Sequence, residues 1–191
     1  IFKELLRQLD YPLAAPSANI TTKVSAVQAA DVLEEFGNKI KYVLDGGKCS
    51  IGIESTIIDL TGRPAILRLG GIDISKIRKT LGIKVNINLH PKNKTVPGQA
   101  HLHYSPGIPL KMNVKNPKKE TAFILIKKRK TKLKNYYYLS TKSNLTEIAK
   151  NLYSCLRKIK NQGYKSIAVE KIPNKGMGKA INDRLFRASR F

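Results

Sequence analysis

The middle of this 191-residue chain holds the feature that most constrains its fold, a stretch rich in proline, glycine and asparagine. From Ile83 to Pro109 these residues recur too often for a helix or strand of normal length. The stretch predicts two folded units joined by a linker. We place the first unit over residues 1–84, the linker over 85–109 and the second unit over 110–191.

A short turn near the start, Pro12–Asn19, has a composition suited to ligand binding. Pro16 fixes its own φ and favours extended backbone at Ala15, so the chain leaves a strand in a defined direction. The small side chains allow a ligand close to the backbone, while Ser17 and Asn19 offer hydrogen-bonding groups. The plainer alternative is a strand-to-helix loop without a ligand.

The rest of the first unit shows alternating helix and strand patterns. Ile1–Leu9 has the pattern of an amphipathic helix, and Ser25 is a suitable cap for a second helix that ends before Gly37. Further elements are predicted as strands at 40–44, 57–58 and 65–69, and as a helix capped by Asp73 and stopped by Gly82.

Polar side chains enter one of these predicted strands in a row. Glu54, Ser55 and Thr56 directly precede the apolar pair Ile57–Ile58. Buried strands rarely carry three polar groups without a partner, so Ser55 and Thr56 could bind a small polar substrate and Glu54 could orient a neighbour. Arg68 lies in the next apolar run, where it either reaches water or meets an anion such as a phosphate.

The second unit alternates strands with helices, which predicts a small α/β layer domain. Leu145–Ile159 has apolar residues on one side, and the last helix, Gly178–Phe191, would leave Arg184 and Arg187 exposed. The predicted strands are Ala122–Ile126, Tyr136–Leu139 and Ser166–Val169.

Histidines and cysteines give no sign of a metal site. His90, His101 and His103 all fall in the linker, without acidic or cysteine partners at metal-binding spacing. Cys49 and Cys155 are far apart, which indicates free thiols and a reducing cytoplasm. No apolar run approaches the length of a membrane-spanning helix, so we expect no membrane partner.

The net charge of +23 is unevenly distributed. Residues 109–191 contain 22 Lys and Arg against 4 Asp and Glu, whereas residues 1–108 contain 14 against 9. Such an excess attracts polyanions, so weak, salt-sensitive RNA binding is one hypothesis. The alternative is a solvated lysine-rich surface, and the run Lys127–Lys130 is most simply a solvated loop.

Five motifs in order resemble the threonylcarbamoyl-AMP synthase family. They are Ala15–Asn19, Leu44–Gly47, Gly52–Asp59, Ile66–Gly71 and His103–Pro106. No single motif is specific, but the order and spacing of the first four are. The resemblance is to the long form and covers nearly the whole chain, including its end at 176–190. It implies an α/β fold: the C-terminal part of a YrdC-like twisted-sheet domain, a linker, and a small Rossmann-like α/β domain.

The resemblance also implies an activity. The family makes L-threonylcarbamoyladenylate and pyrophosphate from L-threonine, bicarbonate and ATP, with Mg²⁺ accompanying ATP. A tRNA threonylcarbamoyl transferase then uses this product to modify the adenosine beside the anticodon. The carried-over ATP contacts are Ser17, Asn19, Ser25, Arg68 and Tyr104, of which Tyr104 would close over the nucleotide from the linker. The carried-over L-threonine contacts are Ala15 and Ser55.

The chain departs from the family pattern in three places. The family's lysine and arginine pair has no counterpart here, and we expect it upstream of Ile1, in a segment that would precede this chain. Residues 96–106 keep the Pro-Gly and His-Tyr steps but lack the usual basic residues between them, and 21–24 lack a glycine and a proline. We expect this chain alone to be weakly active or inactive; the alternative is an RNA-binding or regulatory module without catalysis.

Overall fold

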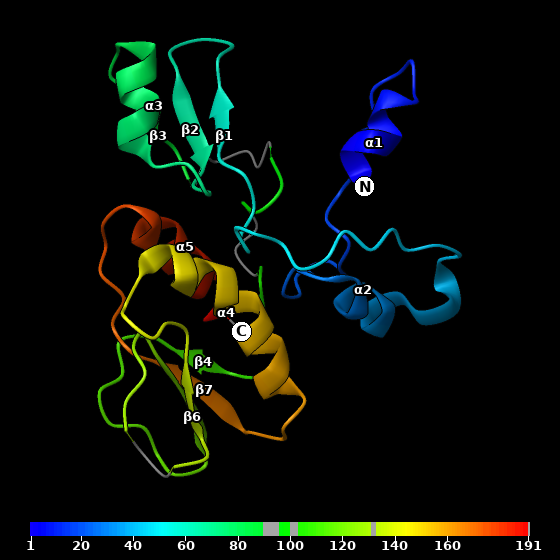
Figure 1. Cartoon of the computed structure of the whole chain (residues 1–191). Helices are drawn as coiled ribbons and strands as arrows, with labels where there is room; N and C mark the ends of the chain where they lie inside the picture. The colour runs from blue at the N-terminus through cyan, green and yellow to red at the C-terminus, as the bar shows by residue number, and fades with distance from the viewer. Residues whose placement is uncertain (90–95, 100–102, 131–132, 191) are drawn as a thin grey trace.

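The computed structural model describes residues 1–89, 96–99, 103–130 and 133–190 (Figure 1). It has the mixed α/β architecture that the sequence predicts, with two separate sheets. The helices are α1 (Phe2–Arg7), α2 (Ala29–Phe36), the 3-10 turn η1 (Gly37–Lys39), α3 (Ile74–Leu81), α4 (Leu145–Lys160) and α5 (Met177–Ala188). The strands are β1 (Ile57–Asp59), β2 (Ala65–Arg68), β3 (Asn86–Ile87), β4 (Leu110–Lys111), β5 (Thr121–Leu125), β6 (Tyr136–Tyr138) and β7 (Ser166–Val169).

The first sheet has the order β1-β2-β3. Strands β1 and β2 run antiparallel, and β3 joins β2 in parallel. Asp73 caps the start of helix α3, where its carboxylate accepts a hydrogen bond from the Ser75 amide at 2.7 Å, and Gly82, with φ 67°, caps its end. Ile66 of the sheet and Ile77 of α3 are buried in one cluster.

The second sheet is parallel, with the order β4-β7-β5-β6. Helices α4 and α5 cover one of its faces (Figure 1). The core between these layers includes Ile124 and Ile167 from the strands and Leu152 and Ile181 from the helices. The opposite face has a smaller cluster around Phe123.

The two parts of the chain share buried surface. Helix α5 lies between the sheets (Figure 1), because Ala180 packs into the cluster around β2 while Ile181 packs into the core of the second sheet. Val24, Val27 and Tyr104, from outside the second unit, are buried in that same core. The two units therefore have a continuous packed interface rather than a flexible joint.

Most predicted elements are confirmed, and three local expectations are wrong. Residues 40–44 form no strand: no described segment pairs with them, and Tyr42 is 90% exposed. The cap of α2 is Gln28, because the Ser25 hydroxyl is bonded to Glu54 instead. The stretch expected to be irregular contributes β3, whose neighbour Val85 is fully buried.

Among the described residues, no helix is long and apolar enough to cross a membrane. Helix α1 is short and has no buried residue, and Phe2 and Leu5 are exposed.

Candidate ligand cavity between the two units

One cavity of about 360 Å³ brings together most of the residues predicted to bind ligands. It lies where the Pro12–Asn19 turn, the loop before β1, the end of β2 and the linker meet. The predicted ligand residues that line it are Ala15, Ser17, Ser25, Ser55, Arg68 and Tyr104; the remaining walls are Pro16, Glu54, Pro97, Gly98 and His103.

A second cavity, of about 420 Å³, shares three of these residues: Ser17, Ser25 and Glu54. It continues along residues 49–53 to Tyr153 of α4. The two cavities therefore adjoin each other at these three polar residues.

Ser55 and Arg68 form the polar wall at the first sheet. The Arg68 guanidinium donates to the Ser55 carbonyl at 3.0 Å, to the Ser55 hydroxyl at 3.1 Å and to the Pro97 carbonyl at 3.2 Å. A guanidinium has five N–H donors, so these bonds leave donor capacity for an anion. Arg68 thus ties β2 to the linker and presents a cation to the cavity.

Glycine at position 70 allows this wall to form. A Cβ at Gly70 would lie 2.2 Å from the carbonyl carbon of Ser55 and the amide of Thr56. No real side chain tolerates such a contact, so the close approach requires glycine. Ser55 can therefore occupy its observed position only because residue 70 of the motif is glycine.

Glu54 connects the cavity to the second unit. Its carboxylate accepts hydrogen bonds from the Ser25 hydroxyl at 2.6 Å and the Tyr153 hydroxyl at 2.9 Å, and it pairs with Arg184 of α5 at 3.2 Å. Burial raises the pKa of Glu54, but the Arg184 charge and these hydrogen bonds outweigh it, so the pKa is lowered. Glu54 is held as a carboxylate.

The expectation that Arg184 and Arg187 are exposed is wrong. Their side chains are only 1% and 3% exposed. Arg184 pairs with Glu54 and Asp183, while Arg187 pairs with Asp183 and donates to the Leu89 carbonyl at 3.0 Å. Buried arginines are stable when paired in this way, and a helical pattern alone cannot reveal carboxylates so far away in the sequence.

Tyr104 is a buried wall of the cavity. Its ring stacks on Tyr153 with centroids 5.7 Å apart, and the Arg184 guanidinium lies 5.4 Å from its centroid. Burial raises the pKa of Tyr104 to about 12, so its hydroxyl stays protonated. Its φ of 61° is rare for a residue other than glycine, and such strain persists where the surroundings fix it.

Asn19 is the predicted ligand residue that does not line the cavity. Its side-chain amide donates to the carbonyls of Ile20 and Lys23 at 3.0 and 3.2 Å and so shapes its own loop. Its Oδ1 atom is buried and has no hydrogen-bond partner within the described chain. Its contact with ATP stays a prediction.

The histidine region shows no metal cluster in the part of the chain that the structure describes. His103 lines the cavity, and burial lowers its pKa, which favours the neutral imidazole. The other two histidines of the linker, His90 and His101, lie outside the described residues.

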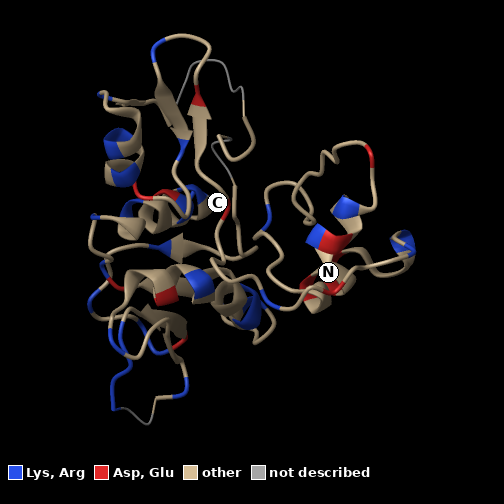
Figure 2. Ribbon diagram, turned by 45° about the horizontal axis from the view of Figure 1, so that its top comes forward, with Lys and Arg blue, Asp and Glu red and all other residues tan. Residues whose placement is uncertain are grey.

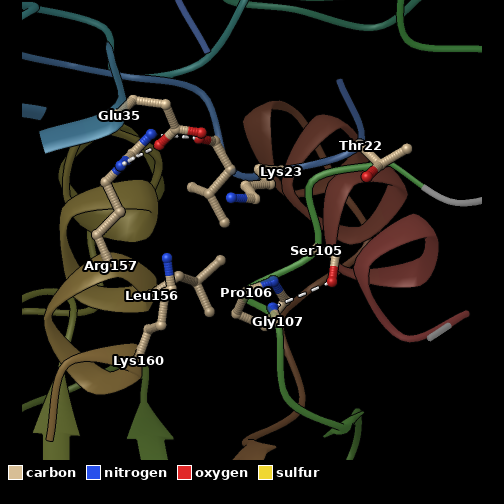
Figure 3. A pocket seen from close by; sticks show the side chains of 10 residues that line it. Thr22, Lys23, Glu35, Ser105, Pro106, Gly107, Leu156, Arg157 and Lys160 are labelled. Carbon is tan, nitrogen blue, oxygen red and sulfur yellow. Dashed lines mark hydrogen bonds and ion pairs between the residues drawn. The ribbon is translucent and has the colours of Figure 1, made fainter. Parts of the chain in front are cut away.

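A third cavity, of about 190 Å³, lies at another part of the interface between the units (Figure 3). There Arg157 of α4 reaches across to Glu35 of α2 at 3.0 Å and donates to the Val24 carbonyl at 2.7 Å. Lys23 and Lys160 also line this space. Arg157 thus holds in place the segment that immediately precedes Ser25.

The sequence missed two participants in the site, Tyr153 and Arg184, while His103 lies in a quoted motif but was given no ligand role. Tyr153 and Arg184 follow Glu54 by 99 and 130 residues, and neither lies in a motif. Tyr153 occurs on the apolar side of α4 and would be assigned to the core by any pattern. The available signal was Glu54 itself, a carboxylate predicted inside a buried strand and therefore in need of a cation.

Two family models match the chain. The one described as "Threonylcarbamoyl-AMP synthase, C-terminal domain" matches residues 72–190, and the one described as "Telomere recombination" matches residues 1–70. The two family models meet at residues 70–72, before α3, whereas the amino-acid composition changes at Ile83, after α3.

Curated relatives and solved structures agree with these matches. The threonylcarbamoyl-AMP synthases of Pyrococcus abyssi and Bacillus subtilis are 35% and 30% identical over 97% of this chain. The chain spans 60% and 59% of their lengths. The crystal structure of P. abyssi Sua5 in complex with L-threonine is 32% identical, with a TM-score of 0.84 over 97% of this chain and 60% of that one. The chain belongs to the threonylcarbamoyl-AMP synthase family.

Proposed function

We propose that this chain forms part of an L-threonylcarbamoyladenylate synthase, a nucleotidyltransferase that supplies tRNA threonylcarbamoyladenosine modification. One observation carries the proposal. Six residues that the resemblance assigns to L-threonine or ATP, from five separate segments, line a single cavity. The family membership makes this reaction the expected use of such a cavity.

We assign L-threonine to the wall made by Ala15 and Ser55. The methyl side chain of Ala15 leaves space beside the backbone, and the Ser55 hydroxyl can bond a small polar molecule. A relative at 32% identity has been crystallised with L-threonine, which supports this ligand class. The Arg68 guanidinium fixes the Ser55 hydroxyl at 3.1 Å and would orient it toward the substrate.

We assign ATP to Ser17, Ser25, Arg68 and Tyr104, with Asn19 shaping the loop that bears Ser17. The Ser17 hydroxyl and the guanidinium are donors that bind phosphate oxygens. The Ser25 hydroxyl donates its proton to Glu54 and can accept a hydrogen bond from the nucleotide. Asn19 would contact the nucleotide only if its loop hydrogen bonds rearrange on binding. Its buried, unpartnered Oδ1 supports such a rearrangement.

The reaction suits a cavity without a covalent nucleophile. The carbamate formed from the L-threonine amine and bicarbonate attacks the α-phosphorus of ATP, and pyrophosphate leaves. This chemistry depends on aligning the reactants and neutralising charge in the transition state. Arg68 would supply the charge, and the serines would supply the alignment.

Magnesium would accompany the nucleotide rather than occupy a protein cage. No cluster of three or more metal-binding side chains occurs among the described residues, and Glu54 is already engaged by Ser25, Tyr153 and Arg184. Mg²⁺ commonly binds through substrate phosphates and water. When bound, it would neutralise phosphate charge.

The two cysteines fit a reducing compartment, and we propose the cytoplasm. Cys49 and Cys155 are both free thiols. Disulfides are rare in such compartments.

The test is incorporation of radiolabelled bicarbonate into the adenylate by the protein made from its full reading frame. We expect incorporation that requires both L-threonine and ATP and that falls at least about tenfold in Arg68→Ala, the loss of one charge-assisted contact. Arg63→Ala, in the exposed turn before β2, is the matched control and should keep full activity. Absence of product from a folded, unmodified protein would refute the proposal.

A further inference from the structure

The carboxylate of Glu54 stands at the point where the ligand cavity meets the second unit. It lines the cavity, yet the groups that hold it come from both units. Ser25 donates from the first unit, whereas Tyr153 and Arg184 contact it from helices α4 and α5. No motif of the first unit accounts for the last two.

We propose that Tyr153 and Arg184 are positioning residues of the ligand cavity: they hold Glu54 in place and, through it, the Ser25 hydroxyl. The C-terminal unit thereby completes the site rather than only following it in the chain. The inference rests on the proposed function for its choice of ligand, L-threonine with ATP. The network of contacts itself does not depend on that choice.

The geometry makes Glu54 dependent on these two residues. Tyr153 and Arg184 both contact the Oε2 atom, which leaves Oε1 for Ser25 at 2.6 Å. The Arg184 side chain is 1% exposed and that of Glu54 is 14% exposed, so water offers little alternative solvation. Without its partners the carboxylate would be a poorly solvated charge and would leave its present position.

Arg184 also has a feature that packing alone does not explain. Its Nη2 atom is buried and has no hydrogen-bond partner within the described chain. A buried donor without a partner costs free energy, which argues against a purely stabilising role for this arginine. Arg184 also lies over the Tyr104 ring, another cavity wall.

A comparison with Arg157 separates this role from simple attachment of the units. Arg157 also crosses the interface as a buried arginine, but its carboxylate partner, Glu35, does not line the ligand cavity. Arg157 reaches the cavity lining only through the backbone carbonyl of Ser25, at 3.5 Å, whereas Arg184 contacts the side chain of a cavity residue, Glu54, at 3.2 Å. Loss of either should loosen the interface, but only loss of Arg184 should free Glu54.

Two conservative variants test the proposal in the intact protein. Tyr153→Phe removes one hydroxyl and keeps the ring, while Arg184→Lys keeps the charge and shortens its reach. Tyr137→Phe is the control, because that hydroxyl is also hydrogen-bonded within the second unit, to Gln162 and Tyr164, but lies outside the cavity. The first readout is the dissociation constant, measured by calorimetry, of an α,β-methylene analogue of ATP with L-threonine present. ATP is the ligand assigned to Ser25, and the analogue cannot release pyrophosphate, so binding is measured without turnover.

We expect this constant to rise about tenfold in Tyr153→Phe and in Arg184→Lys, because each loses a hydrogen bond to a charged group. The constant should stay within about twofold in Tyr137→Phe, because this change lies away from the cavity. In the Glu54→Gln background, Tyr153→Phe should add little further loss, since both act through the same carboxylate. Equal constants in all variants would overturn the inference.

A second readout needs no ligand and separates this inference from the proposed function. Deuterium uptake at residues 53–56 should be faster in Tyr153→Phe and Arg184→Lys than in Tyr137→Phe, while uptake in β5 stays unchanged. If the unmodified protein does not bind the ATP analogue, the proposed function fails, and this difference in uptake would still support the positioning role. Unchanged uptake at 53–56 would reject it.

Discussion

Among single residues, Glu54 is the one whose charge state the fold controls most visibly. Its pKa is lowered from the ordinary value of 4.5: burial acts to raise it, but Arg184, Ser25 and Tyr153 favour the carboxylate more strongly. A depressed pKa in the folded state contributes stability above the unfolded value, and that contribution is lost as the pH falls through the folded value.

We therefore predict a pH-dependent gap between the unmodified protein and Glu54→Gln. The difference in free energy of unfolding should be full above about pH 4.5 and should shrink as the pH falls further. Urea unfolding at several pH values between about 3 and 7 would measure it. Exposed Glu120→Gln is the control, and a gap that does not change with pH would contradict the prediction.

Most of the predicted ligand residues do line the cavity, but the burial and partners of the surrounding side chains could not be predicted from the sequence. Small and polar residues at Ala15, Ser17 and Ser55 suggested a ligand because such side chains leave donors accessible. The burial of Arg184 could not be predicted, because a helix pattern assigns a face by polarity. A cation on the apolar side is recognised only when its carboxylate partner is known.

At the scale of elements, helix α4 holds the first unit through Arg157 (Figure 3). The guanidinium bonds Val24, Ser25 and Glu35, and the Glu35 side chain is only 4% exposed. We predict that Arg157→Met lowers the free energy of unfolding by about 3–5 kcal/mol, because it leaves a buried carboxylate unpaired.

The matched control is Lys158→Met, the exposed neighbour on the same helix. It should change stability by no more than about 0.5 kcal/mol, as surface substitutions usually do. Denaturant unfolding of both variants gives the comparison. Equal losses would mean that Arg157 contributes no more than an ordinary surface residue.

Elements with a complete local pattern could be predicted from the sequence, and those that depend on a distant partner could not. Strand β7 was predicted with its observed bounds, and the predicted bounds of α4 differ from the observed ones by one residue. Both elements have patterns of apolar residues that can be recognised within a short stretch of sequence. The predicted strand at 40–44 has an equally good composition. It fails because a strand requires a neighbouring strand, which local composition does not provide.

At the scale of the whole molecule, the dominant property is positive charge. Figure 2 shows Lys and Arg distributed over both parts and gathered on the loops of the second unit, with few acidic residues among them. The sequence gives residues 109–191 a large excess of cations. Such a surface attracts RNA without reading its bases.

We predict that any RNA binding is weak and strongly salt-dependent. The logarithm of the association constant should fall linearly with the logarithm of salt concentration, with a slope near −0.7 per phosphate neutralised on single strands, roughly the value for counterion release. Fluorescence anisotropy with unrelated RNA sequences would measure it. Binding that survives moderate salt and prefers one sequence would instead support a dedicated RNA-binding module.

The burial of Val24, Val27 and Tyr104 within the core of the second sheet has a consequence for exchanging parts among relatives. A chimera cut in the linker follows the boundary in the sequence. It would nevertheless place foreign side chains at positions within the core of the second sheet. The residues that must be exchanged together are therefore those that pack together, not those that are adjacent in the sequence. A working hybrid would take Val24, Val27 and Tyr104 from the same parent as the C-terminal unit they pack against.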